Sequence, residues 1–183
     1  MLKSTCLESD CISDRTEYQK DNEMTKGFCC GTFDPITIGH VDIIERASKL
    51  CSKIVVGVVV NYAKASYFTL EERTEMVKAA LAHLKNVEVV CFSEHLPTYV
   101  INHGFDVIIR GLRNESDFDY EIGLAQLYDH FFKGCCETVY IMTKPEYSYI
   151  SSTIVRQNFQ LGADISGWVT PPVYKLMEQY KNG

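Results

Sequence analysis

Basic, hydroxyl-bearing and glycine residues gather at four places where an apolar run of the sequence gives way to a polar one. These residues are Gly31, Thr32, Gly39 and His40; Lys64; Arg110 and Arg113; and residues 147–153 (YSYISST). Lysine and arginine neutralise phosphate charge, and arginine can bind two phosphate oxygens at once. Glycine lets the backbone approach a ligand closely. The combination predicts a site for a phosphate-bearing ligand.

His40 follows Gly39 at the expected start of a helix, where backbone N–H groups are free and the helix dipole is positive. Such a helix end can hold phosphoryl oxygens, and so can the one expected at residues 151–153. An imidazole there can donate a hydrogen bond to an oxygen whose negative charge grows in a transition state. No Ser-His-Asp or Cys-His arrangement is evident, so we expect no covalent intermediate. The P-loop and dinucleotide-binding glycine motifs are also absent from the sequence.

The composition narrows the class of partner. The chain has 183 residues and a formal net charge of −6, which argues against a broad electrostatic grip on nucleic acid. Its apolar runs are far shorter than the ~20 residues of a membrane span, and the first residues lack the apolar stretch of a secretory signal. We therefore expect a cytoplasmic protein without a nucleic-acid or membrane partner. The eight cysteines favour reduced thiols, and their spacing predicts no metal site.

Short apolar runs alternate with amphipathic stretches along most of the chain. Strands are predicted at residues 27–30, 53–60, 87–92, 106–109 and 137–142. Helices are predicted at residues 40–51, 69–84, 95–103, 117–132 and 151–161, with a last one beginning at Pro171. Because each strand-like run is apolar on both faces, the fold class is α/β, with a doubly wound, five-stranded parallel sheet of Rossmann-like type. Ligands bind beyond the carboxyl ends of such strands, where the four polar places fall.

The first 26 residues differ from the rest of the chain. They contain no periodic apolar pattern, no glycine and no proline, and they are polar throughout. We interpret residues 1–26 as a flexible N-terminal extension and residues 27–183 as a single domain.

Several of these segments resemble a known family. Residues 31–40 (GTFDPITIGH) resemble the T/HxGH signature of the nucleotidyltransferase superfamily. More narrowly, the chain is similar to the bacterial-type phosphopantetheine adenylyltransferases over residues 27–179. The matching segments are residues 68–73 (FTLEER), 86–90 (NVEVV), 110–113 (RGLR), 117–121 (DFDYE) and 147–153. The resemblance implies a nucleotidyltransferase fold and adenylyl transfer from Mg²⁺-ATP to 4′-phosphopantetheine, giving dephospho-coenzyme A and pyrophosphate. It also implies direct in-line attack and a homo-oligomer, usually a hexamer.

The resemblance further implies roles for individual residues. His40 would stabilise the transition state, with Lys64 and Arg113 as further catalytic residues. Phosphopantetheine would be bound by Thr32, Lys64, Leu96 and Arg110. ATP would be bound by Thr32, Phe33, His40, Gly111, Leu112, Arg113, Glu121, Tyr147, Ser148, Tyr149, Ile150, Ser151, Ser152 and Thr153.

Two other functions remain open at this point. Residues 150–156 (ISSTIVR) are similar to a segment of the nicotinate and nicotinamide mononucleotide adenylyltransferases, which would use a different acceptor for the same reaction. A catalytically idle module that binds a nucleotide or coenzyme A would carry the same fold. Release of pyrophosphate, and the acceptor that supports it, separates the three functions.

Some of the chosen residues also have purely structural interpretations. His40 alone could cap a helix, and residues 34–35 are expected only to start a turn. Arg113 could form a surface ion pair with an acidic residue that follows it, either Glu115 or Asp117. Asp117 and Glu121 are spaced i, i+4 on one expected helix, so they could form a solvated acidic face.

Overall fold

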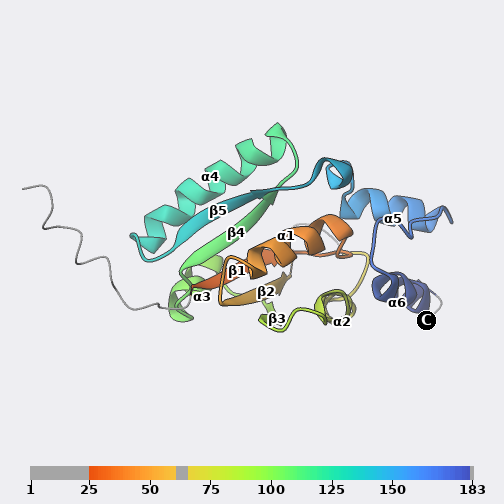
Figure 1. Ribbon diagram of the computed structural model, residues 1–183, viewed down its shortest axis with the longest axis horizontal. Helices are drawn as coiled ribbons and strands as arrows, with labels where there is room; N and C mark the ends of the chain where they lie inside the picture. Colours follow the sequence, from red (N-terminus) through yellow and green to blue (C-terminus); the bar gives the residue numbers. More distant parts are fainter. Residues whose placement is uncertain (1–24, 61–65, 182–183) are drawn as a thin grey trace, which may run out of the picture.

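The computed structural model describes residues 25–60 and 66–181 (Figure 1). Residues 1–24, which make up most of the expected N-terminal extension, lie outside the described residues. Lys64, expected to act on the substrates, lies outside them as well. Within the described part of the chain, no helix is long and apolar enough to cross a membrane.

A parallel sheet forms the centre of the described residues. Its strands are β1 (Lys26–Gly31), β2 (Lys53–Val59), β3 (Val87–Phe92), β4 (Val107–Leu112) and β5 (Glu137–Met142). They lie in the order β3-β2-β1-β4-β5, and every neighbouring pair is parallel. The chain winds outward from β1 in one direction and then from β4 in the other. The fold is therefore the predicted doubly wound α/β type, and its topological switch point falls between β1 and β4.

Helices cover both faces of this sheet (Figure 1). They are α1 (Ile38–Ser48), α2 (Leu70–Leu81), α3 (Leu96–Asn102), α4 (Glu115–Phe132), α5 (Ser152–Gln160) and α6 (Pro171–Lys181), with a short 3-10 helix, η2 (Pro145–Tyr147), between β5 and α5. One apolar core joins α1, α2, α5 and α6 to one face. A second core joins α3 and the end of α4 to the other face around Phe28, which no solvent reaches. Successive strand residues point to opposite faces, so β1 and β2 contribute to both cores.

The strand β4 is longer than the sequence predicts. The predicted strand ends at residue 109, whereas Arg110, Gly111 and Leu112 continue the ladder opposite Tyr140, Ile141 and Met142 of β5. Arg110 and Gly111 therefore lie in the strand and not beyond it. The polarity of this segment predicts a loop, but pairing with β5 continues the strand. The charge of Arg110 is tolerated there because Glu121 and the Cys30 carbonyl bind it.

The edge strands also differ from the prediction that every strand is apolar on both faces. β3 and β5 lie at the two edges of the sheet, and each has exposed or half-buried residues along most of its length. The interior strand β2, in contrast, is buried almost throughout. The alternating exposure of β5 matters for assembly, as described below.

Helix starts follow the expected capping chemistry. Thr69 caps α2 and forms a reciprocal capping box with Glu72, as the sequence predicts. α1 begins two residues earlier than expected, at Ile38, with Thr37 as its N-cap. His40 is consequently the third residue of α1, inside its first turn. Ser151 caps α5, so the N-terminus of that helix faces the end of the sheet as expected.

Candidate active site

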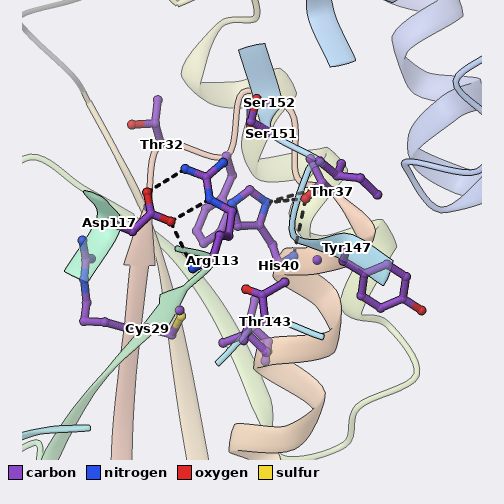
Figure 2. Close-up of a pocket in the computed structure, with 18 of the residues that line it drawn as sticks. Cys29, Thr32, Thr37, His40, Arg113, Asp117, Thr143, Tyr147, Ser151 and Ser152 are labelled. Atoms are coloured by element: carbon purple, nitrogen blue, oxygen red, sulfur yellow. Dashed lines mark hydrogen bonds and ion pairs between the residues drawn. The ribbon is translucent and has the colours of Figure 1, made fainter. Parts of the chain in front are cut away.

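A cavity of about 360 Å³ opens at the carboxyl ends of β1 and β4, at the topological switch point. Twelve of the predicted site residues line it: Thr32, Phe33, His40, Arg110, Gly111, Arg113, Glu121, Tyr147, Ile150, Ser151, Ser152 and Thr153. Its apolar wall includes Ile43, Ile44 and Ile109. Figure 2 shows the His40 ring lying between Arg113 and Thr37, close to Ser151 and Ser152. The fold therefore brings most of the predicted residues together in one place.

Four predicted residues do not line this cavity. Leu112 is buried at the end of β4, where its backbone pairs with Met142 of β5. Ser148 and Tyr149 lie in the segment before α5, where Tyr149 is exposed. Leu96 begins α3 and packs against the core on the other face of the sheet. None of these four residues is part of the cavity wall.

His40 is held by the N-cap residue of its own helix. The backbone N–H of Thr37 donates a 3.0 Å hydrogen bond to His40 Nδ1, and the Thr37 hydroxyl lies 3.0 Å from the same nitrogen. Burial, followed by the positive charge of Arg113, lowers the pKa of His40 to about 4. His40 is therefore a neutral imidazole near pH 7. Thr37 is not among the residues predicted from the sequence, although a threonine three residues before a capping side chain is a recognisable signal.

Arg113 forms a two-pronged ion pair with Asp117. Its Nε and Nη2 atoms lie 2.8 and 2.9 Å from the two carboxylate oxygens, and its backbone N–H donates to the same carboxylate at 3.1 Å (Figure 2). These hydrogen bonds lower the pKa of Asp117 and raise that of Arg113. Of the two acidic partners considered from the sequence, Asp117 is the one that the structure shows.

Arg110 pairs with Glu121 in the same manner, one helical turn further along α4. Its Nε and Nη2 atoms lie 2.6 and 2.5 Å from the carboxylate oxygens, and Nη1 donates to the carbonyl of Cys30 at 3.1 Å. The Cys30 thiol, whose pKa burial raises, also contacts Arg110. Asp117 and Glu121 are thus not a solvated acidic face. They turn toward the cavity and each holds one arginine.

Arg73 is a site component that the sequence analysis missed. It lies on α2, is only 3% exposed, and donates hydrogen bonds to the carbonyls of Thr32, Val59 and Phe68 at 2.6, 2.9 and 3.2 Å. One buried guanidinium therefore ties the carboxyl ends of β1 and β2 to the start of α2. Its signal was present in the sequence, because an arginine spaced i, i+3 and i+4 from Met76 and Val77 lies on the apolar stripe of its helix.

Asp34 does more than start a turn, which corrects the expectation for residues 34–35. Its buried carboxylate accepts hydrogen bonds from the backbone N–H groups of Tyr67 and Phe68 at 2.9 and 3.0 Å. It also pairs with Arg156 of α5 at 3.3 Å. This one carboxylate therefore joins the segment after β1, the segment before α2 and helix α5. Backbone N–H groups that a helix or sheet leaves free need such partners when they are buried.

Comparison with known proteins agrees with this geometry. The family model described as cytidylyltransferase-like matches residues 28–158. The phosphopantetheine adenylyltransferase of Streptococcus sanguinis is 41% identical over 154 residues, which is 84% of this chain and 93% of that protein. The phosphopantetheine adenylyltransferase of Clostridium botulinum is 45% identical over 139 residues, which is 76% of this chain and 87% of that protein.

A solved structure from Vibrio parahaemolyticus, provisionally named a nicotinate-nucleotide adenylyltransferase, superposes with a TM-score of 0.64 at 20% identity. It covers 85% of this chain and 93% of its own, and at that identity it supports the fold alone. The fold and the cavity at its switch point are those of a nucleotidyltransferase. The chain belongs to the cytidylyltransferase-like family and, within it, to the phosphopantetheine adenylyltransferases.

Proposed function

We propose that this protein transfers the adenylyl group of ATP to 4′-phosphopantetheine, giving dephospho-coenzyme A and pyrophosphate, as a cytoplasmic step of coenzyme A synthesis. One observation carries the proposal. A neutral imidazole, two arginines and the N-terminus of α5 meet in one cavity, in a chain that is 41–45% identical to phosphopantetheine adenylyltransferases over most of its length.

ATP is proposed to occupy the part of the cavity between α1 and α5. The isoleucine side chains of its wall, Ile43, Ile44, Ile109 and Ile150, suit the flat apolar face of adenine. The first turn of α5, with Ser151 as N-cap, offers backbone N–H groups and a positive dipole end to the phosphates. Thr32, Phe33 and Gly111 complete this part of the wall. Leu112, Ser148 and Tyr149 are proposed to support the segments that form this wall without contacting ATP themselves.

The acceptor is proposed to approach from the side of Arg110, with Lys64 and Leu96 contributing to its binding. An oxygen of its phosphate attacks the α-phosphorus of ATP and forms a new P–O bond. The bond from that phosphorus to the bridging oxygen breaks, and pyrophosphate leaves with the electron pair. Because the acceptor phosphate is already ionised near neutral pH, no strong general base is needed. Catalysis then depends on alignment and on stabilisation of the charge that develops.

His40, Arg113 and Lys64 are proposed to supply that stabilisation. His40 donates a hydrogen bond to a non-bridging oxygen of the α-phosphate, where negative charge grows in the transition state. Arg113 neutralises the departing pyrophosphate, since its guanidinium lines the cavity next to His40. Lys64 would add a positive charge near the attacking phosphate.

Magnesium is proposed to enter as part of the ATP substrate. Among the described residues, no group of three or more His, Cys, Asp and Glu side chains could hold a metal ion. The carboxylates on the cavity wall, Asp117 and Glu121, already bind arginines. Mg²⁺ commonly keeps several waters and is held mainly by substrate phosphates with one or two carboxylates. The cavity thus fits an ion that the ATP phosphates carry, and the ion supplies charge neutralisation there.

A homo-oligomer, with a hexamer as the expected size, is proposed as the working form. Support comes from α4, in which only Phe132 is fully buried. Its exposed apolar side chains are Phe118, Tyr120, Ile122, Leu127 and Phe131. Met142 of the edge strand β5 is exposed on the same face of the sheet, two residues from Tyr140, whose hydroxyl donates to the Glu121 carbonyl of α4. A second copy of the chain would cover this surface. Sedimentation velocity should give an oligomer that Leu127→Glu dissociates, and a monomeric wild type would contradict the proposal.

The acceptor assay tests the proposed reaction. Pyrophosphate release from Mg²⁺-ATP is measured with 4′-phosphopantetheine and, separately, with nicotinamide mononucleotide. Release only with phosphopantetheine is the expected result. Release only with the mononucleotide would keep the reaction type but replace the acceptor. Tight ATP binding with no release from either would indicate an idle binding module.

A further inference from the structure

Thr37 and His40 form a capping box in which a histidine takes the place of the usual glutamate or glutamine. In the common form, the third residue of the helix accepts a hydrogen bond from the N-cap backbone N–H. Here His40 Nδ1 is the acceptor, 3.0 Å from the Thr37 nitrogen. The Thr37 hydroxyl accepts from the His40 backbone N–H at 3.4 Å, and it lies 3.0 Å from Nδ1.

This contact determines which ring nitrogen of His40 carries the proton. A backbone N–H can only donate, so Nδ1 must offer its lone pair and cannot be protonated. The one proton of a neutral imidazole is then on Nε2. Among the described residues no hydrogen bond engages Nε2, and His40 lines the cavity. The Nε2–H group is thus available as a donor to a ligand.

The same arrangement disfavours a histidine cation. Protonation of Nδ1 would set two N–H donors against each other, at Thr37 and at His40. His40 also lies in the first turn of α1, at the positive end of the helix dipole. Arg113 is the charged group that acts on His40 directly, and Asp117, which neutralises part of that charge, is bound to Arg113 and not to His40. The helix dipole, the capping contact and the charge of Arg113 therefore all disfavour the protonated form of His40.

We propose that Thr37 is a positioning residue that holds His40 as the neutral Nε2–H tautomer with that N–H directed into the cavity. His40 then stabilises the transferring phosphoryl group as a hydrogen-bond donor, and it neither gains nor loses a proton during the reaction. The role of the donor rests on the proposed function. The tautomer does not, and it can be measured without any substrate.

The tautomer is tested by nitrogen NMR of the full chain with ¹⁵N-labelled histidine at pH 7, without substrate. The His40 signals are those that disappear in His40→Gln, a variant whose side chain can still complete the capping box. The expected spectrum shows an unprotonated Nδ1 and a protonated Nε2. A protonated Nδ1, or a cationic ring, would overturn the proposal whatever the enzyme catalyses.

The positioning role is tested with Thr37→Val, which keeps the backbone N–H but removes the hydroxyl contact to Nδ1. We expect kcat to fall roughly tenfold, the loss of about one hydrogen bond, with little change in the KM for ATP. The acid limb of the kcat profile should move to higher pH, because the neutral ring loses the hydrogen bond that the hydroxyl donates to its Nδ1. Thr37→Ser should restore both properties.

Thr69→Val provides the matched control, because Thr69 forms the equivalent capping box of α2 outside the cavity. It should lower Tm about as much as Thr37→Val does, while kcat and its pH profile stay at the wild-type values. If Thr37→Val lowers Tm like Thr69→Val and leaves kcat and the pH profile unchanged, the Thr37 side chain is only a helix cap and the proposed positioning role is wrong.

Discussion

Arg110 and Glu121 face each other across the space between β4 and α4, joined by two parallel hydrogen bonds of 2.6 and 2.5 Å. Arg113 and Asp117 repeat the arrangement one turn earlier on the same helix. The i, i+4 spacing of the two acids thus aligns two guanidinium groups along one wall of the cavity. A guanidinium already held in position loses less conformational freedom when it binds a phosphate, which favours alignment of the reacting groups.

Replacement of Glu121 by glutamine tests how much its ion pair with Arg110 contributes to stability and to substrate binding. The variant leaves the charge of Arg110 without its carboxylate in a site where the two side chains are 22% and 13% exposed. We expect the free energy of unfolding to fall by about 1–3 kcal/mol in urea denaturation. The KM for phosphopantetheine should rise, because Arg110 is no longer fixed.

Asp117→Asn is the matched comparison for Glu121→Gln. The pair of Arg113 and Asp117 is more exposed, at 36% and 23%, so the loss of stability should be under about 1 kcal/mol. Equal losses in the two variants would show that burial does not set the strength of these ion pairs.

Arg73 should affect activity without touching a substrate. Arg73→Lys keeps the charge but cannot reach the carbonyls of Thr32, Val59 and Phe68 together, so it should lower kcat/KM about tenfold and stability by about 2 kcal/mol. Arg46→Met is the control, because Arg46 also bonds a backbone carbonyl but lies on the surface side of α1. A wild-type kcat/KM in Arg73→Lys would remove Arg73 from the positioning of Thr32.

The pKa of His40 predicts how stability varies with pH. The unfolded chain binds a proton at His40 below about pH 6.5, whereas the folded protein does so only below about pH 4. Between these values acidification favours the unfolded state, and stability falls by about 1.4 kcal/mol per pH unit from this group. The difference in unfolding free energy between wild type and His40→Gln should show this slope from pH 6.5 to pH 4.5 and none above pH 7. A constant difference would mean that His40 titrates normally in the fold.

The sequence was sufficient to predict the fold class and the location of the cavity. Five apolar runs separated by helical patterns require parallel strands, and the carboxyl ends of such strands meet at one edge. The capping box of Thr69 and Glu72 could also be predicted, because it depends only on two residue types three positions apart.

Long-range contacts account for what the sequence could not predict. The strand β4 extends through Leu112 because β5 pairs with it, and no local pattern near Arg110 reveals that ladder. Asp34 joins Tyr67, Phe68 and Arg156, which lie far away along the chain. An aspartate followed by a proline predicts only a turn when those distant partners are not known.

We propose that His40 accelerates adenylyl transfer by a hydrogen bond made in the transition state. The measurement that tests it most directly compares wild type with His40→Ala, by pyrophosphate release at saturating substrates and by calorimetric titration with ATP. We expect a loss of turnover of about 10²–10³-fold, with a Kd for ATP that changes little. Unchanged turnover, or a loss that is explained entirely by weaker ATP binding, would contradict it.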